Sequence, residues 1–104
     1  LIHKNLIPIY VRDKGTHALV DSGAHISVIN ERFLYRLGLN SRYYKPSNIS
    51  QIVGAGGESH RISGLVQLNL KIGGLRFSHS FYVVPALTHS GILGIDFLTK
   101  YNLL

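Results

Sequence analysis

The sequence contains no cysteine, few acidic residues and no long apolar run. Without cysteine the chain cannot form a disulfide or a cysteine-based zinc site, and its redox compartment cannot be inferred. The apolar stretches are only a few residues long, and residues 1–5 lack the apolar segment of a signal peptide, so we expect a soluble protein. A length of 104 residues with 45% hydrophobic residues and no low-complexity linker predicts one compact domain over residues 1–104.

The charge balance is basic, with 5 acidic residues against 11 Lys and Arg and a formal net charge of +6. Such a charge favours nucleic acid or another anionic surface through counterion release. The basic residues are scattered along the chain, however, and no spacing typical of a nucleic-acid-binding motif occurs. We therefore expect a solvated basic surface and no dedicated nucleic-acid or membrane partner, with a basic β-domain for nucleic acid kept as a third hypothesis.

The histidines do not predict a metal site. None of the six shows His-x-x-x-His or a comparable ligand spacing, so a bound metal is not expected. We expect no other cofactor either. His79 falls on the apolar face of an expected strand, where a packed histidine is the stronger interpretation. The six are His3, His17, His25, His60, His79 and His89.

Alternating apolar residues predict two β-hairpins. Between residues 64 and 85 the apolar side chains recur at every second position, and the pair Gly73-Gly74 interrupts them. An earlier hairpin is expected from residues 6–11 and 16–20, with its turn at residues 13–15.

Two short helices complete the expected fold. Asn30 is a suitable N-cap and Gly38 a suitable C′ residue for a helix over Glu31 to Leu37. A second helix is expected to begin near Asp96, whose predicted role is helix start or surface ion pair. Strands and glycine turns dominate and no βαβ alternation occurs, so the sequence predicts an all-β domain.

The segment Asp21-Ser22-Gly23-Ala24 directly follows the apolar run 18–20 and precedes a further expected strand over residues 25–29. This order predicts a carboxylate in a buried turn, where Ser22 and the backbone at Gly23 stabilise its charge. An Asp-Ser-Gly taken alone is more typical of an ordinary Asx turn. The position of this segment between two expected strands favours the interpretation that Asp21 is a catalytic acid.

Two further segments follow in order. Residues 51–58 are rich in glycine but lack the Gly-Lys-Ser/Thr end and the following helix of a phosphate loop, so they predict either a plain hairpin turn or a mobile β flap. Residues 91–98, Gly-Ile-Leu-Gly-Ile-Asp-Phe-Leu, predict a core strand behind the Asp21 turn, followed by a helix.

Taken together, residues 18–24, 52–57 and 92–98 resemble the retropepsins, the retroviral-type aspartic proteases. The resemblance spans nearly the whole chain. The helix over 30–38 and the Ile-Leu-Gly-Ile-Asp-Phe-Leu ending look more like proteases of LTR retrotransposons, or the cellular DNA-damage-inducible family, than like those of lentiviruses. The implied fold is a closed β-barrel of hairpins with a β flap and one or two short helices.

The resemblance also implies roles for individual residues. Asp21 would be catalytic and would pair with Asp21 of a second subunit, because the chemistry needs two carboxylates that share one proton and the chain holds one such motif. Ser22, Gly23 and Ala24 would support the catalytic loop. Leu19, Ile92 and Leu93 would line or support apolar substrate pockets. The flap would comprise Ile52, Val53, Gly54, Ala55, Gly56 and Gly57.

The sequence departs from the viral pattern at three places. His25 and Ile26 replace acidic residues that hold the substrate main chain in many relatives, and Ala55 is small for a flap tip. Residues 101–104 leave little for a C-terminal interface strand, so we expect either a different dimer contact or a dimer that is weak without flanking sequence. The implied function is a homodimeric aspartic endopeptidase that cleaves extended segments of a retroelement polyprotein. A catalytically silent dimer that binds peptides or mediates assembly is the alternative.

Overall fold

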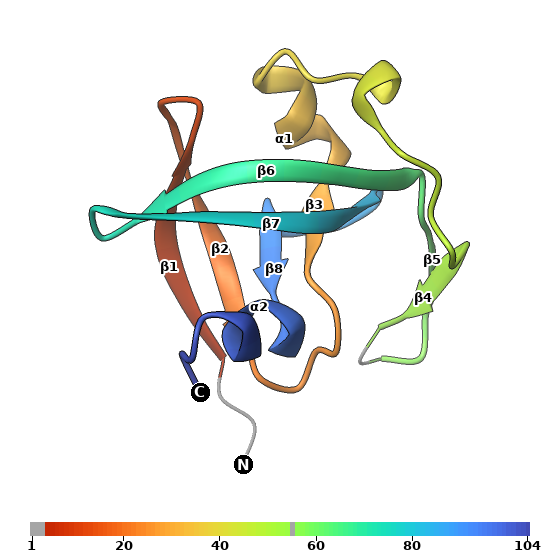
Figure 1. The fold of residues 1–104 in the computed structure, drawn as a ribbon. Coiled ribbons are helices and arrows are strands. Elements are labelled where there is room, and N and C mark those ends of the chain that lie inside the picture. Colours follow the sequence, from red (N-terminus) through yellow and green to blue (C-terminus); the bar gives the residue numbers. More distant parts are fainter. Residues whose placement is uncertain (1–3, 55) are drawn as a thin grey trace.

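The computed structural model describes residues 4–54 and 56–104, and most of its regular structure is β-strand (Figure 1). The strands are β1 (Lys4–Val11), β2 (Lys14–Asp21), β3 (Val28–Asn30), β4 (Gln51–Val53), β5 (Ser59–Arg61), β6 (Gly64–Ile72), β7 (Leu75–Val84) and β8 (Gly91–Leu93). The helices are α1 (Glu31–Arg36), the 3-10 helix η1 (Ser41–Tyr43) and α2 (Ile95–Lys100).

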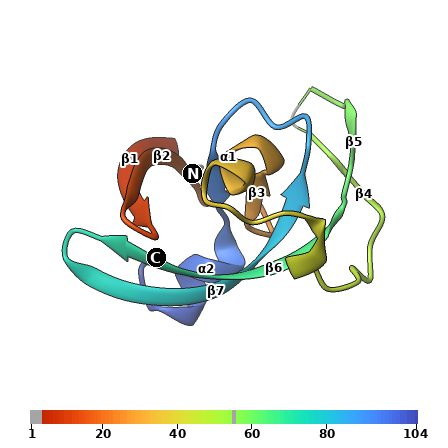
Figure 2. The ribbon, with the colours of Figure 1, turned by 90° about the horizontal axis from the view of Figure 1, so that it is seen from above.

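A closed barrel forms the body of the molecule, with strand order β1-β2-β8-β3-β7-β6. β4 and β5 form a separate two-stranded hairpin. Both views place this hairpin and the β1–β2 hairpin on opposite sides of the barrel, and Figure 1 places α1 and α2 at opposite ends (Figures 1 and 2). The predicted all-β barrel with a flap-like hairpin and short helices is confirmed.

The long hairpin β6–β7 follows the predicted alternation. Val66 pairs with Phe81 and Leu70 pairs with Phe77, which turns the apolar side chains of both strands toward the interior. The turn at Gly73-Gly74 has φ angles of 56° and 85°, a left-handed conformation that glycine adopts without strain.

The turn of the β1–β2 hairpin lies earlier than predicted. Residues 13–15 were expected to turn, but Arg12 and Asp13 do so, with φ angles of 50° and 63°, and Lys14 already pairs with Val11. This register places Val11 inside the barrel together with Ala18. A register slip of one residue would turn the buried side chains of β2 outward, so side-chain burial overrides the preference of Gly15 for a turn.

Both helices are present with small shifts at their ends. The side chain of Asn30 accepts a hydrogen bond from the N–H of Phe33 at 3.1 Å, as expected of an N-cap, and α1 ends one residue before the predicted Leu37. α2 begins at Ile95. No helix in the described part of the chain has the length and apolarity that crossing a membrane requires.

The barrel interior holds the main apolar core, and α1 and α2 close its ends. Its buried members are Ile9, Val11, Ala18, Ile29, Phe33, Leu34, Leu37, Leu39, Val66, Leu68, Leu70, Phe81, Val83, Leu93, Phe97 and Leu98.

Candidate active site

β8 lies between the two arms of the loop that follows Asp21. β2 pairs with β8 in parallel, with Leu19 opposite Ile92, while β3 pairs with it in antiparallel, with Val28 opposite the same residue. The chain therefore leaves the sheet at the end of β2, turns through residues 22–27 and returns on the other side of β8. Backbone hydrogen bonds to one central strand fix both ends of the loop.

The strand predicted over residues 25–29 is shorter than expected. Only residues 28–30 form β3, and residues 25–27 belong to the loop. The backbone N–H of Ser27 donates to the carboxylate of Asp96 rather than to a neighbouring strand. The carbonyl of Ser27 accepts from the N–H of Tyr82 in β7 at 3.1 Å, so pairing with β7 begins only at this residue.

Asp21 is the last residue of β2, and the turn that follows holds its carboxylate. The N–H of Gly23 donates to Oδ1 at 2.9 Å, and the N–H of Ala24 donates to the Asp21 carbonyl oxygen at 3.1 Å. The Asp21 side chain is 13% exposed, so it is enclosed yet open to a ligand. Ser22 is half-buried, while Gly23 at the tip of the turn is exposed in the single chain.

Lys4 places a positive charge beside this carboxylate. It is the register partner of Asp21 across the β1–β2 hairpin, and its Nζ lies 3.9 Å from Oδ2. The Lys4 side chain is 51% exposed, so solvent screens the pair and its contribution to stability is small. The sequence pattern did not single out Lys4, because only the strand register brings it to this place.

Gly94, which follows β8, lies in close contact with the backbone of the loop. A Cβ at this position would lie 2.5 Å from the carbonyl oxygen of Ile26 and 2.8 Å from that of Ala24. The N–H of Ile95 donates to the Ala24 carbonyl at 2.7 Å, which joins the loop to the start of α2. Only glycine permits so close an approach of two backbones.

Asp96, in the first turn of α2, links the loop to β7. Its Oδ1 accepts a hydrogen bond from the Ser27 hydroxyl at 2.6 Å. Its Oδ2 lies 3.0 Å from Nε2 of His79, which donates because a carboxylate only accepts. The ring of His79 packs edge-on against Phe81 and Phe97. His79 is therefore a packed histidine, as predicted, and Asp96 makes a partly buried hydrogen bond with it rather than the predicted surface ion pair.

Burial and hydrogen bonding act on the Asp96 carboxyl in opposite directions. Burial raises its pKa, but hydrogen bonds from His79, from Ser27 and from the backbone outweigh this effect and lower the pKa below its usual range. This network was not predicted, because its three members are far apart in the sequence. Only the packing of α2 against β7 and the loop brings them together.

Leu19 and Ile92 share the outward face of the barrel wall with Asp21. They oppose each other across β2 and β8, and Asp21 lies two positions after Leu19, a spacing that returns a side chain to the same face. Both are half-buried. Leu93 points the other way and is 1% exposed in the barrel core, so it does not line this face and can only support it from behind.

The predicted glycine-rich segment forms the β4–β5 hairpin. The N–H of Gly54 donates to the carbonyl of Glu58 at 2.7 Å, and Gly57 has a φ angle of 86°, so the two glycines shape the turn. Gly56 is exposed. Ala55, the predicted tip residue, lies outside the described residues.

An apolar cluster connects this hairpin to the outward face. Ile52 of β4 and Ile92 of β8 both pack against the buried residues Val28, Ile62 and Val84. Val53, the neighbour of Ile52, points away and is 71% exposed. The structure therefore joins Ile52 with Ile92 through shared packing and leaves Val53 free to contact a ligand.

The chain places a single carboxylate at this site. Within the described residues, no three His, Asp or Glu side chains gather as a metal ion would require. The other acidic residues serve elsewhere: Asp13 in the β1–β2 turn, Glu31 bonded to the Tyr44 hydroxyl, Glu58 beside His60, and Asp96 in the network with Ser27.

A closed barrel whose central strand separates the arms of an Asp-Ser-Gly loop, with a separate β-hairpin, defines the retropepsin-like class of fold. The structure is similar to the retroviral protease-like domain of Ddi1 from Leishmania major, with a TM-score of 0.76 and 23% identity over 98% of this chain and 76% of that one. It is also similar to an inhibitor-bound EIAV protease, with a TM-score of 0.74 and 22% identity over 98% and 91% of the two chains.

A retropepsin-like aspartic protease from Rickettsia conorii is a third similar structure, with a TM-score of 0.69 and 21% identity over 93% of this chain and 71% of that one. Comparison with curated protein sequences gives no match. The family model for aspartyl proteases matches residues 7–97, and the chain belongs to that family.

Proposed function

We propose that this chain is an aspartic endopeptidase that acts as a homodimer. The observation that carries the proposal is the enclosed carboxylate of Asp21, held at the end of β2 by Gly23 and aligned with the outward face of Leu19 and Ile92. Aspartic proteases hydrolyse peptides with two carboxylates that share one proton. Because the remaining acidic residues lie elsewhere in the chain, the second carboxylate would come from Asp21 of another copy.

In the proposed mechanism, one Asp21 carboxyl is protonated and the other is ionised. The ionised member takes a proton from a water molecule, while the protonated member polarises the scissile carbonyl, and their roles reverse when the amine leaves. Activity should peak at acid to mildly acid pH, because the dyad must hold one proton.

The proposed substrate is a peptide in extended conformation. It would lie between the outward face and the β4–β5 hairpin, which offers backbone groups and closes over the site. Ser22 would hydrogen-bond across the dyad, the Gly23 carbonyl would accept from the substrate backbone, and Ile52, Val53 and Ile92 would contact its side chains. We propose retroelement polyproteins as the source of such segments, on the resemblance of residues 18–24 and 92–98 to that group.

The direct test is cleavage of a fluorogenic peptide library by the wild type and by Asp21→Asn. We expect the substitution to abolish cleavage, and Asp13→Asn, which removes a carboxylate from an exposed turn, to retain it. Wild-type-like cleavage by Asp21→Asn would refute the proposal. Cleavage by neither protein, together with binding of a pepstatin-like mimic, would instead favour the silent peptide-binding dimer.

Sedimentation velocity tests the assembly separately. We expect a pepstatin-like transition-state mimic to shift the wild type toward a dimer, because the mimic contacts both Asp21 residues at once. A monomer that the mimic leaves unchanged at all concentrations would contradict the shared site.

A further inference from the structure

A row of side chains crosses the outer surface of four strands. Gly15 of β2 lies opposite Tyr10 of β1, Tyr10 lies opposite Lys71 of β6, and Lys71 lies opposite Arg76 of β7. Directly opposed residues point to the same face of a sheet, with their Cβ atoms about 5 Å apart. Tyr10, Lys71 and Arg76 are all exposed, so this face is outward. We call these four residues the basic row.

The two cations of the basic row face each other without a counterion. Like charges directly opposite in a hairpin repel and destabilise the pairing. Within the described residues, neither Lys71 nor Arg76 takes part in an ion pair. The β6–β7 segment, residues 64–84, contains no acidic residue at all. A bound anion would relieve this repulsion.

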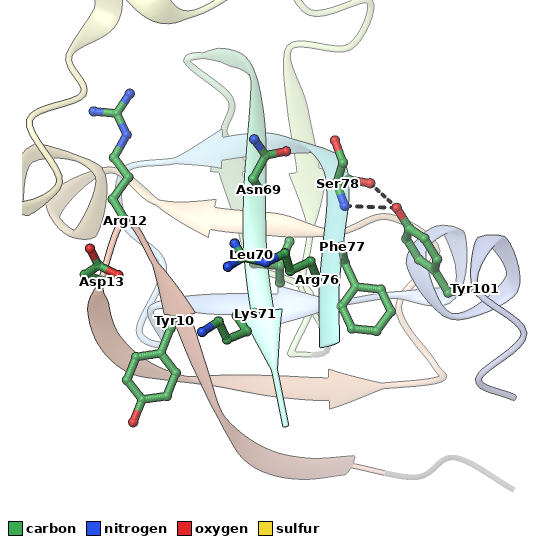
Figure 3. Close-up of a pocket in the computed structure, with 10 residues that line it drawn as sticks. All are labelled: Tyr10, Arg12, Asp13, Asn69, Leu70, Lys71, Arg76, Phe77, Ser78 and Tyr101. Carbon is green, nitrogen blue, oxygen red and sulfur yellow. Dashed lines mark hydrogen bonds between the residues drawn. The ribbon is translucent and has the colours of Figure 1, made fainter. Parts of the chain in front are cut away.

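A surface cavity of about 860 Å³ opens along the basic row (Figure 3). Arg12 adds a third cation to its lining, and Asp13 contributes a carboxylate. The Arg12 guanidinium donates to the carbonyl of Leu37 at 3.3 Å, so it extends toward the C-terminal end of α1. In Figure 3 the Lys71 and Arg76 side chains both extend toward the β1 side, where Arg12 lies. Three cations and one carboxylate thus line the cavity.

Tyr10 supplies an aromatic surface beside these cations. Tyr10 is 52% exposed, and its ring rests against Gly15, where an added Cβ would lie 3.0 Å from ring atom Cε1. Glycine therefore lets the ring lie flat along the sheet. Cations next to an accessible aromatic ring bind single-stranded nucleic acid, because phosphates pair with the cations while a base stacks on the ring. An acidic peptide would use the cations but leave the ring without a function.

We propose that this cavity binds single-stranded nucleic acid, with phosphates at Arg12, Lys71 and Arg76 and a base stacked on Tyr10. The sequence alone predicted a dispersed basic surface, because the basic residues are scattered along the chain. Strand pairing brings Lys71 and Arg76 next to each other and to Tyr10. The site is separate from Asp21. Gly15 and Asp21 are six residues apart on β2, about 20 Å along an extended strand. The proposal is therefore independent of the peptidase function.

Fluorescence anisotropy with a short labelled single-stranded RNA, titrated at several salt concentrations, tests this inference. We compare Lys71→Gln/Arg76→Gln with Arg32→Gln/Arg42→Gln, a control that removes the same charge from exposed residues of α1 and η1. The first variant should bind at least tenfold more weakly. Its log–log salt slope should fall by about 1.4, because each phosphate neutralised on a single strand accounts for about 0.7 of the slope. Equal weakening in both variants would overturn the proposal, because net charge alone would then explain binding.

Substitutions at Tyr10 test the stacking. Tyr10→Leu should weaken binding by roughly tenfold, and Tyr10→Phe should retain it, because stacking needs the ring and not the hydroxyl. Circular dichroism checks that each variant is folded. No binding of the wild type at low salt would overturn the proposal. The proposal would also be overturned if Tyr10→Leu bound RNA as tightly as wild type and polyglutamate competed with RNA equally well. That result would indicate an acidic protein partner instead.

Discussion

At the scale of single residues, the loop that follows Asp21 depends on the carboxylate of Asp96. Asp96 accepts hydrogen bonds from the backbone and hydroxyl of Ser27 and from His79, so one carboxylate joins the loop, β7 and α2. Ser27 is fully buried and His79 is 7% exposed, so removal of the carboxylate leaves polar groups without partners in the interior. The position of Asp21 thus depends on a residue 75 positions away in the sequence.

This network predicts a specific dependence of stability on pH. The pKa of Asp96 is lower in the folded chain than the ordinary value of an aspartate in an unfolded one. A carboxyl shifted in this direction contributes stability above its unfolded pKa, and the contribution is lost as the pH falls through the lower, folded value. Asp96→Asn should therefore reduce the free energy of unfolding by about 1–2 kcal/mol at neutral pH. The difference from wild type should shrink below about pH 4.

Urea unfolding from pH 7 to pH 3 measures this difference. Asp13→Asn, which removes a carboxylate from an exposed turn whose left-handed backbone Asn tolerates, is the control and should change stability little. If the unfolding free energies of wild type and Asp96→Asn differed by the same amount at every pH, the ionised carboxylate of Asp96 would not be the source of its stabilising effect.

Gly94→Ala should damage the loop through sterics alone. The new Cβ would lie 2.5 Å from the Ile26 carbonyl oxygen and 2.8 Å from that of Ala24, and neither backbone can move without displacing the loop. We expect a loss of about 1–3 kcal/mol in unfolding free energy, as for overpacking, with a fall in peptidase rate. In the control Gly15→Ala, the Cβ meets only the ring of Tyr10, which is 52% exposed and can turn aside. Thermal unfolding that ranks the two variants equally would contradict this account.

The sequence allowed prediction of the loop but not of what surrounds it. Asp21 was found because its carboxylate follows an apolar strand and begins an Asp-Ser-Gly turn, which is a local pattern. Lys4 and His79 were not assigned to the site, since register and packing bring them there and neither leaves a local signal. Leu93 was grouped with Ile92 by resemblance, although the strand period places adjacent residues on opposite faces.

At the scale of elements, the sequence predicts a hairpin correctly where its turn residues and its buried apolar residues specify the same strand register. The β6–β7 hairpin was predicted with its turn because the apolar alternation and Gly73-Gly74 both specify the same register. In the β1–β2 hairpin the two signals conflict, since Gly15 suggests a later turn than the buried alternation allows. The burial of Val11 decides the register, and Arg12 adopts a positive φ as a result.

Asn30 at the start of α1 joins a helix to the rest of the fold, and this predicts a measurable contribution. Its side chain accepts from the N–H of Phe33 at 3.1 Å and donates to the carbonyl of Leu87 at 2.6 Å, and it is 6% exposed. Asn30→Ala should lower the free energy of unfolding by about 2 kcal/mol, because it removes an N-cap and leaves buried groups unpaired. Thermal unfolding followed by circular dichroism measures the loss.

Asn40 is the matched control for Asn30. It caps η1 by accepting from the N–H of Arg42 at 3.0 Å, but it is exposed, so water can take the place of its side chain. Asn40→Ala should therefore lower stability less than Asn30→Ala does. The reverse order would show that burial of the cap does not set its contribution.

At the scale of the whole molecule, the chain presents half of the proposed chemistry. The turn that follows Asp21 holds its carboxylate, and the start of α2 is hydrogen-bonded to the same loop at Ala24, yet no other acidic residue in the described ranges lies beside this carboxylate. Leu6 of β1, which pairs with Leu19, is 56% exposed, and Ile95, whose N–H donates to the Ala24 carbonyl, is 37% exposed. Exposed apolar groups around an incomplete site favour contact with a second copy.

Subunit mixing tests this shared site directly. If two Asp21 residues form one dyad, a dimer of one wild-type and one Asp21→Asn subunit lacks a complete dyad and is inactive. With free exchange in an equimolar mixture, about one quarter of the dimers carry two wild-type chains, so activity should fall to about half of that retained on dilution with an inert protein. A self-sufficient monomer would give the same activity in both mixtures. Measuring peptide cleavage in the two mixtures at equal total protein therefore shows whether Asp21 acts alone or as half of a pair.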